Sequence, residues 1–187
     1  ERYNPFYSFL AHRLCSSMHQ FKLTFQFAYW DRLKSICDAS GSYGGGKAAS
    51  SRRGATRVRQ LSNLARAMAY LIVQFSLSLA ILKVVEFGPT MSKDAIVFFR
   101  VVFHAILNDR RCRKTDRVME IFSRIAGSSE HALVRQGVLF FMQKHVLPKL
   151  KRAWKSAKAG GGSYVAEQEA YEKARSACQC IDKVTVF

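Results

Sequence analysis

The sequence predicts an all-α protein in which antiparallel helical hairpins stack side by side. Apolar residues recur at spacings of three and four along most of the chain, the period of a helix that buries one face. Residues that cap or break helices interrupt these patterns. Hydrophobic residues make up 49% of the 187 residues and include 14 phenylalanines, so the chain can bury a core. Such a stack is either a HEAT-like solenoid or an irregular bundle, because no residue-level repeat separates the two.

The first hairpin is predicted to span residues 1–37. Asn4 and Pro5 mark the start of its first helix, because asparagine caps free amide groups and proline fits the first turn. A second helix is predicted over about residues 23–37. The residues expected on the buried faces of this hairpin are Phe6, Phe9, Leu10, Leu14, Phe27, Trp30 and Leu33.

A second hairpin is predicted around a break near Phe75. Apolar residues with helical spacing indicate a helix that ends there: Leu61, Leu64, Ala65, Met68, Leu71, Ile72 and Phe75. Ser76 or Ser78 can cap a further helix that ends near Val85. The alternation over residues 75–79 also fits a strand, but this run is short and lies between helical patterns.

Three more helices are predicted in the second half of the chain. Ser92 can cap the first of them, and Thr115 or Asp116 can cap the next. A long helix over about residues 130–155 is expected to kink or break at Pro148. The core residues predicted on the first two are Ile96, Phe99, Phe103, Ile106, Leu107, Val118, Ile121, Phe122 and Ile125.

The predicted organisation is one helical domain with an insertion and a tail. Residues 1–37 supply its first hairpin and residues 56–158 its remaining helices. Residues 38–55 are rich in glycine and serine, which predicts a flexible insertion. Residues 159–187 are predicted to form a glycine linker followed by a tail helix over about residues 164–181. The sequence fits both a tail helix that docks on the body and one that swings free.

The chain is strongly basic. It has 30 lysines and arginines against 13 acidic residues, which gives a net charge of +17. Such excess charge attracts polyanions and speeds encounter with them, so nucleic acid is the expected partner. The 5 cysteines are odd in number, and no signal-peptide pattern opens the chain, which favours a reducing nuclear or cytosolic compartment.

The longest uncharged run, residues 67–82, is predicted to be a buried helix pair. It falls short of the roughly 20 residues that a membrane span needs. It also contains Gln74, Ser76 and Ser78, which a bilayer disfavours. We therefore expect no contact with a membrane.

No group of residues in the sequence indicates catalysis, a metal or a cofactor. The histidines are scattered without cysteines or carboxylates at ligand or triad spacing, and His145 fits the edge of a core. Cys178 and Cys180 are too close for a paired zinc knuckle, and a helix would point them apart. Ala48 follows Lys47 where a phosphate-binding loop needs a hydroxyl residue. The expected protein is not an enzyme and uses no cofactor.

Three groups of basic residues are the candidate nucleic-acid-binding sites. Each group alone fits a solvated helix face, but three in one chain favour phosphate contact by at least one, since phosphate neutralisation dominates non-specific affinity for nucleic acids. The first group is Arg52, Arg53, Arg57 and Arg59. The second group is Arg110, Arg111, Arg113 and Lys114. The third group is Lys144, Lys149, Lys151, Arg152, Lys155 and Lys158.

Aromatic residues are not expected to form a base-stacking platform. Such platforms need exposed rings beside basic residues. The rings predicted instead to lie on core stripes are Phe6, Phe9, Phe27, Trp30, Phe99 and Phe103. Trp154 lies among basic residues and is the exception, since it can either stack on a base or cover the last turn of the core.

Five segments resemble the C-terminal region of a nucleolar protein family. They are YNPFYSFL at residues 3–10, FQFAYWD at 25–31, QLSNLA at 60–65, SLSL at 76–79 and VVEF at 84–87. That family, which includes suppressor of glycerol defect protein one, carries a middle domain of initiation factor four G followed by an MA-three domain. The resemblance favours a helical stack of the MA-three type. It also implies that this chain is the latter part of that domain with a C-terminal extension.

The resemblance implies a non-catalytic scaffold in ribosome biogenesis. Proteins of this family look like adaptors in small-subunit (18S rRNA) processing within the nucleolar pre-ribosome, or small-subunit processome. The implied location is the nucleus and nucleolus, and the implied partners are pre-rRNA or snoRNA and assembly factors. A DEAD-box RNA helicase would be engaged through an upstream domain outside this chain.

A spliceosomal scaffold with the same domain order is the rival resemblance. The alternative function is therefore a protein-interaction module of a spliceosomal or translation-initiation adaptor, which binds a DEAD-box helicase or splicing factors through apolar grooves. Asn4 and Pro5, with the FQF and WD motifs of residues 25–31, favour the nucleolar branch. A third reading, a helical enzyme, requires a site that the sequence does not reveal.

Overall fold

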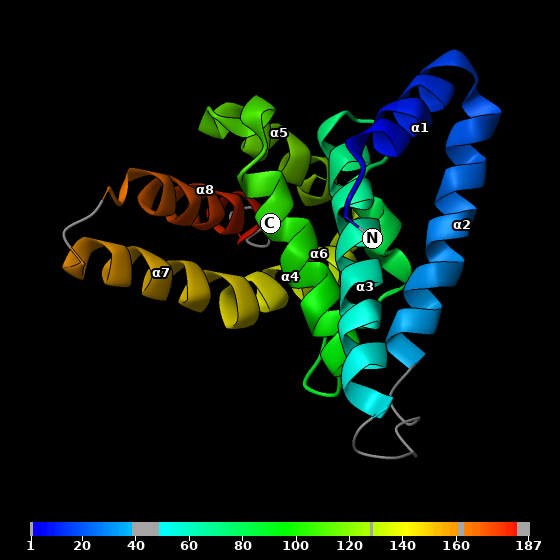
Figure 1. Cartoon of the computed structure of the whole chain (residues 1–187). Helices are drawn as coiled ribbons and strands as arrows, with labels where there is room; N and C mark the ends of the chain where they lie inside the picture. Colours follow the sequence, from blue (N-terminus) through cyan, green and yellow to red (C-terminus); the bar gives the residue numbers. More distant parts are fainter. Residues whose placement is uncertain (1, 39–48, 128, 161–162, 183–187) are drawn as a thin grey trace.

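The computed structural model describes residues 2–38, 49–127, 129–160 and 163–182 (Figure 1). These residues form eight α-helices joined by short 3₁₀ and π segments, and they contain no strand. The prediction of an all-α fold is confirmed. Within these residues, no helix is long and apolar enough to span a bilayer.

The N-terminal hairpin consists of α1 (Pro5–Ser17) and α2 (His19–Asp38). The predicted cap is confirmed, because the side-chain oxygen of Asn4 accepts a hydrogen bond from the backbone N–H of Phe6 at 3.0 Å. Pro5 lies in the first turn, where its missing N–H leaves no hydrogen bond unmade. The side chains that α2 buries are Tyr29, Leu33 and Ile36.

The predicted apolar face of this hairpin is wrong for its outer half. The exposed fractions are 59% for Phe6, 50% for Phe9, 44% for Leu10 and 58% for Phe27. The C-terminal half of α2 packs against the body, while α1 packs chiefly on α2 and α3. A helix pair at the end of a stack has a neighbour on one side only, so the apolar side chains that point away from that neighbour stay exposed. Periodicity reveals such a stripe but not what covers it.

The next helix, α3 (Ala49–Val73), begins inside the range assigned to a flexible insertion, of which residues 39–48 lie outside the described residues. The chain turns after α3 at Phe75, whose φ of 60° lies in the left-handed region. The Phe75 ring lies between the guanidinium groups of Arg117 and Arg124 from α5, each 3.8 Å from the ring centroid. These two contacts hold the turn in a conformation that costs a bulky residue roughly 1–2 kcal/mol.

The predicted fourth α-helix is wrong, because Leu79–Val84 forms only a short 3₁₀ helix, η1. Ser78 caps it, as one of the two predicted caps. A short apolar run cannot by itself specify a multi-turn helix, since helix nucleation is costly and tertiary packing decides its form. The carbonyl oxygen of Ile81 accepts a hydrogen bond from the indole N–H of Trp30 at 2.9 Å, which ties η1 to α2.

The helix α4 (Lys93–Leu107) follows the predicted pattern. Ser92 caps it by accepting a hydrogen bond from the N–H of Ala95 at 3.1 Å, and its hydroxyl donates to the carbonyl of Ile36 at 2.9 Å. The predicted core positions of α4 that are fully buried are Phe99, Phe103, Ile106 and Leu107. Ile96 is half-buried and packs at the edge of the core.

The short helix η2 (Arg110–Cys112) leads into α5 (Thr115–Ala126), and η3 (Ser129–His131) follows. The predicted cap of α5 is wrong, because Thr115 is already the first helical residue and Lys114 occupies the cap position without a side-chain hydrogen bond. The predicted core residues of α5 are confirmed as buried: Val118, Ile121, Phe122 and Ile125.

The long helix predicted over residues 130–155 is divided into α6 (Ala132–Phe141), a π segment η4 (Met142–Val146) and α7 (Leu147–Ala159). The predicted break at Pro148 is confirmed. Proline has no N–H to donate and its ring clashes with the carbonyl four residues earlier, so the helix widens before it.

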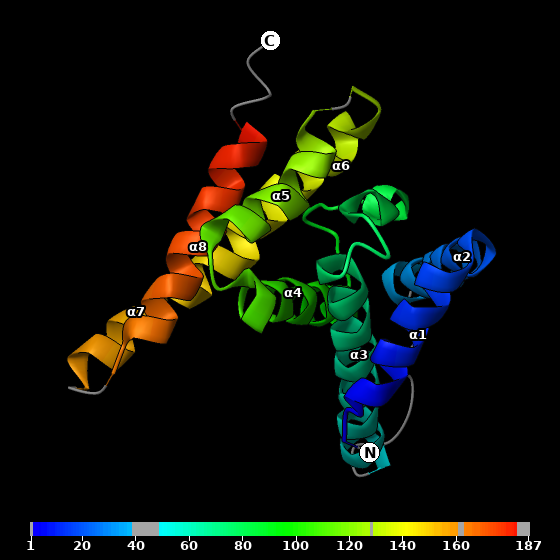
Figure 2. The ribbon, with the colours of Figure 1, turned by 90° about the horizontal axis from the view of Figure 1, so that it is seen from above.

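The tail helix α8 (Val165–Asp182) docks on the body against α5 and α7 (Figure 2). The side chains buried by this docking are Ala170, Lys173, Ala174, Ala177, Cys178 and Ile181. Trp154 of α7 stacks on Tyr171 of α8, with ring centroids 5.6 Å apart and planes at 21°. Trp154 therefore covers the end of the core, where α7 meets α8. This is the second of the two roles predicted for it.

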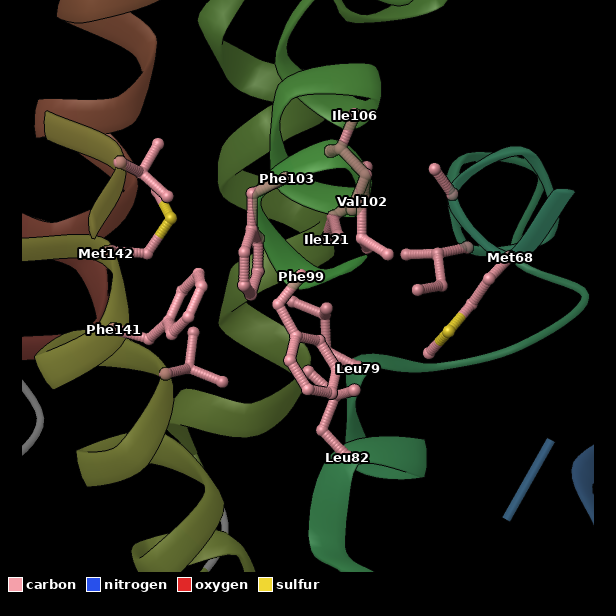
Figure 3. Close-up of a cluster of buried hydrophobic side chains, with 14 of the residues drawn as sticks. Met68, Leu79, Leu82, Phe99, Val102, Phe103, Ile106, Ile121, Phe141 and Met142 are labelled. Carbon is pink, nitrogen blue, oxygen red and sulfur yellow. The ribbon is translucent and has the colours of Figure 1, made fainter. Parts of the chain in front are cut away.

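The core is organised around phenylalanine rings that join η1, α4 and α6 (Figure 3). Phe141 is fully buried, and its ring centroid lies 5.9 Å from that of Phe99 and 5.8 Å from that of Phe103. Phe87 completes the cluster at 5.6 Å from Phe141. Leu82 from η1 lies beside these rings in Figure 3.

Gly137 of α6 provides a test of this packing. A Cβ at this position would lie 2.8 Å from Cδ2 and 3.1 Å from Cβ of Phe87. We expect Gly137→Leu to lower the free energy of unfolding by about 1–3 kcal/mol, measured by urea denaturation, because overpacking outweighs the gain of about 1 kcal/mol in helix propensity. Gly54→Leu in α3 is the matched control, since nothing lies within 4 Å of its Cβ position. Equal changes in both variants would contradict the prediction.

Candidate nucleic-acid interface

Two hollows on one face bring together basic residues from distant segments. The large hollow, of about 680 Å³, lies between α3, α4 and the start of α7 and is bordered by the N-terminal segment. The small hollow, of about 480 Å³, lies between α3 and the N-terminal segment. Tyr3 and Arg66 line both hollows, so the two adjoin each other. We call them together the basic cleft. Figure 2 shows the N-terminus lying against α3.

Helix geometry places the cleft residues. On α4, Val97, Val101 and Ala105 recur at spacings of four and line the large hollow, while Arg100 and His104 follow the same spacing beside them. Because α3 packs most extensively against α4, its Arg66 and Tyr70 meet this face. The π segment and α7 close the far side with His145, Val146, Lys149 and Leu150.

The cations of the large hollow are not neutralised by the protein. Among the described residues, no carboxylate forms a salt bridge with Arg66, Arg100, Arg110 or Lys149. Asp109 is the one carboxylate among the lining residues. Its Oδ1 accepts a hydrogen bond from the backbone N–H of Arg111 at 2.8 Å and lies 3.5 Å from the guanidinium of the same residue. The hollow is therefore strongly positive.

The pKa values of three titratable groups in the cleft are lowered, in part by its positive charges. Desolvation lowers the pKa of His104, and the charges of Arg66 and Arg100 lower it further. Desolvation also lowers the pKa of His145, with added contributions from Lys144, Arg100 and Lys149. The pKa of Lys149 is lowered by desolvation and then by Arg100 and Arg152. The charge of Arg100 contributes to the lowered pKa of all three groups.

Tyr3 is held in place at the junction of the two hollows. Its hydroxyl shares a hydrogen bond with the hydroxyl of the buried Ser8 at 2.8 Å. The guanidinium carbon of Arg66 lies 5.8 Å from the centroid of the Tyr3 ring. This pair fixes a planar cation beside a planar ring at the point where the hollows meet.

Each of the three basic groups predicted from the sequence contributes to the basic cleft. Arg59 of the first group lines the small hollow, while Arg110 of the second and Lys149 of the third line the large one. Arg57 instead pairs with Asp94 at 2.6 Å.

The other members of the three groups lie elsewhere. Arg111 lies over the ring of Tyr70, 5.2 Å from its centroid. The side chains of Arg52 and Arg53 lie outside the described ones. Exposed residues that line neither hollow are Arg113, Lys114, Lys144, Lys151, Arg152, Lys155 and Lys158. For all of these, contact with nucleic acid stays a prediction.

Sequence reasoning missed Arg2, Arg66 and Arg100 as candidate binding residues, although all three line the cleft. None of them lies in a basic cluster. A signal for Arg100 was present, because it is the one charged residue, apart from a histidine, in the apolar run over residues 95–107. A charge inside such a helix marks the edge of its buried face.

Among the described residues, no three histidines, cysteines or acids gather as a metal site. Burial raises the pKa of Cys112 and of Cys178 to about 11 each, which keeps both thiols protonated at neutral pH. His145 packs on the ring of Phe141 with centroids 4.9 Å apart, the position predicted for it at the edge of the core.

Comparisons with known proteins agree with the resemblance. The family model described as the MA3 domain matches residues 1–78. The chain is 32% identical over 155 residues to nucleolar MIF4G domain-containing protein 1 of mouse and, equally, of human, which covers 83% of this chain. It is 29% identical over 110 residues, or 57% of this chain, to suppressor of glycerol defect protein 1 of Schizosaccharomyces pombe, of which it covers 13%. No solved structure matches the chain.

The chain spans only a small part of these curated relatives, 16% of the length of the mouse and human proteins. The MA3 match starts at the first residue and covers α1, α2, α3 and the following turn. The helices from α4 onward, which complete the basic cleft, lie beyond this match but within the described fold. The chain carries an MA3 domain and is a homologue of the nucleolar MIF4G domain-containing protein 1 and suppressor of glycerol defect protein 1 family.

Proposed function

We propose that this chain is a non-catalytic scaffold of ribosome biogenesis that binds pre-rRNA or snoRNA together with assembly factors. The basic cleft is the observation that carries this proposal, because it gathers cations from the N-terminal segment, α3, α4, η2 and α7. Those of the large hollow have no carboxylate partner among the described residues, and the single carboxylate of its lining, Asp109, is already engaged by Arg111. Such a surface suits a chain of phosphates. The proposed setting is small-subunit (18S rRNA) processing in the nucleolar pre-ribosome. The word nucleolar in the names of the relatives supports the location in this proposal.

A DEAD-box RNA helicase belongs to the proposal as a partner of the longer protein. The names of the mouse and human relatives include a MIF4G domain, and this chain matches a small share of those proteins. We place helicase engagement on a domain outside this chain. The role of the chain itself is then to hold RNA and neighbouring proteins near that helicase.

Salt dependence tests the RNA-binding part of this proposal. If three or four cleft cations contact phosphates, the affinity of the chain for a structured RNA should fall at least about tenfold between roughly 50 and 200 mM salt, because bound counterions are released on binding. Replacing Arg66 with glutamine should reduce the slope of log affinity against log salt by about 0.7–0.9. Fluorescence anisotropy with a labelled RNA hairpin measures both quantities.

The control for this measurement is Arg32→Gln, which removes an equal charge from an exposed side chain of α2 that lies outside the cleft and outside the three basic groups. Its slope should stay near that of the unchanged chain. RNA binding that is weak and insensitive to salt would overturn the proposal, and equal losses of slope in both variants would place the binding surface elsewhere.

A second candidate function rests on the uncovered face of the N-terminal hairpin. Phe6, Phe9 and Phe27 are each at least half exposed there, and Tyr7 is 70% exposed. Several large exposed aromatic side chains on one helical hairpin favour a protein partner. A module of a spliceosomal or translation-initiation adaptor would use this face and not the cleft. Capture of spliceosomal components in place of pre-ribosomal ones from a nuclear extract would support this function.

A further inference from the structure

The large hollow has the dimensions of a small-molecule site. Its volume of about 680 Å³ falls within the range of roughly 300–1,000 Å³ typical of ligand pockets. A base inside a duplex is stacked and paired, so it cannot enter such a hollow. An unpaired base can turn out of its strand and enter it.

The lining combines the surfaces that a nucleotide needs. Val97, Val101 and Leu150 offer an apolar wall to a base. Arg100 and Lys149 offer cations to a phosphate, and neither has a carboxylate partner among the described residues. A bare phosphate would leave the apolar wall unused, and an apolar ligand would leave the cations unpaired, so a ligand with both parts matches best.

We propose that the large hollow receives one unpaired nucleotide of a bound RNA, with its phosphate held by Arg100 and Lys149 and its base against the valine wall of α4. This inference rests on the proposed RNA-binding function and names the element of RNA structure that the chain recognises.

The small hollow can hold the next part of the same RNA strand. Arg66 borders both hollows, and Arg2 and Arg59 line the small one. A second row of cations next to the first suits the next phosphate of the same strand, whereas a free nucleotide or a phosphorylated side chain has no group to place there. RNA therefore fits the basic cleft better than a phosphopeptide does.

The histidines of the large hollow support a phosphate ligand. Their pKa values are lowered in the free chain, and a phosphate beside them would raise both, so nucleotide binding should take up protons and tighten as the pH falls from 7.5 toward 6. The titratable and charged groups that face these histidines are Arg66, Arg100, Asp109, Arg110, Lys144 and Lys149.

Filling the hollow without altering its charge tests the inference. Ala105 lines the large hollow on α4 and is only half-buried, so the ring of Ala105→Phe has room to occupy the nucleotide position. Ala166→Phe on the exposed surface of α8 is the control. The probes are a short unstructured oligoribonucleotide and a blunt RNA duplex with the same number of phosphates.

The unchanged chain and Ala166→Phe should bind the unpaired RNA about tenfold more tightly than the duplex. Ala105→Phe should lose this preference and keep its salt-dependent binding to the duplex. Adenosine monophosphate should compete for the oligoribonucleotide, whereas inorganic phosphate and a phosphoserine peptide at the same concentration should not.

Equal binding of both RNAs by the unchanged chain, or a preference that survives in Ala105→Phe, would overturn the inference and leave the proposed function intact. Competition by the phosphoserine peptide as strong as that by the nucleotide would also overturn it. If thermal unfolding shows that Ala105→Phe is not folded, Arg100→Gln decides instead, since it should abolish the preference while Arg32→Gln retains it. Salt-insensitive binding to both RNAs would overturn the proposed function itself.

Discussion

Replacing Arg100 with glutamate is expected to lower the affinity of the chain for RNA by roughly 30-fold or more, equivalent to about 2 kcal/mol. Arg100 lines the large hollow, where its charge lowers the pKa of His104, His145 and Lys149. The substitution removes a cation and places an anion where the phosphate would lie. Anisotropy titration with a labelled RNA hairpin at low salt measures the loss.

The same substitution should leave the stability of the fold nearly unchanged, which separates a binding defect from unfolding. In the free chain, Arg100 repels Lys149 and lacks a carboxylate partner among the described residues. Glutamate at this position attracts its neighbours, so the free energy of unfolding should stay within about 0.5 kcal/mol of its original value or rise. The pKa of His104 should rise because a nearby cation becomes an anion, and NMR titration detects this change.

Arg32→Glu provides the matched comparison, because it makes the same charge change on an exposed side chain that lines neither hollow and belongs to none of the three basic groups. Its loss of RNA affinity should be several-fold smaller. An equal loss in the two variants would show that net charge, and not the cleft, determines binding. A large loss of stability in Arg100→Glu would show that Arg100 is a structural residue.

Local sequence signals predicted most helix starts and the inward faces of the central helices. Asn4 and Ser92 cap helices because their side chains accept backbone hydrogen bonds, which depends only on neighbouring residues. The stripe through Phe99 and Phe103 is buried on α4, which lies between other helices. When a helix has neighbours on several sides, the apolar stripe seen in its sequence is also the face that it buries.

Predictions failed where the outcome depended on distant contacts. Phe6 and Phe9 form a helical stripe as regular as that of α4, but α1 has no further helix outside it among the described residues, so these rings are exposed. The run after Phe75 was predicted as an α-helix, but a left-handed turn held by Arg117 and Arg124 from α5 precedes a short 3₁₀ helix. No local pattern encodes a turn that a later helix stabilises.

The sequence predicted that the candidate site is a basic surface, but it did not predict all of the residues that form it. Net charge and clusters indicated a basic surface, and Arg59, Arg110 and Lys149 were among the named residues. Arg66 and Arg100 were absent because each stands apart from the basic clusters, on a helix with an apolar face. Their proximity arises from the packing of α3 on α4, which the sequence does not specify by itself.

Replacing Phe141 with alanine is expected to lower the free energy of unfolding by about 3–5 kcal/mol, as measured by urea denaturation. Its ring is fully buried and packs against the rings of Phe99 and Phe103 (Figure 3). It also packs against the ring of Phe87. Alanine would leave a cavity at the centre of this cluster and remove aromatic pairs worth about 0.5–1.5 kcal/mol each. Since domains of this size are stable by about 5–15 kcal/mol, the variant should be close to unfolding.

Phe9→Ala is the control, because it makes the same chemical change on α1 at a side chain that is 50% exposed. Its expected loss is at most about 1 kcal/mol. Sequence periodicity alone ranks the two phenylalanines as equals, so a similar loss in both variants would contradict the packing described for α1. Phe141→Leu should lose less, about 1–1.5 kcal/mol, and remain folded. Because His145 packs on the Phe141 ring and lines the large hollow, this milder variant should still weaken RNA binding, whereas Phe9→Ala should not.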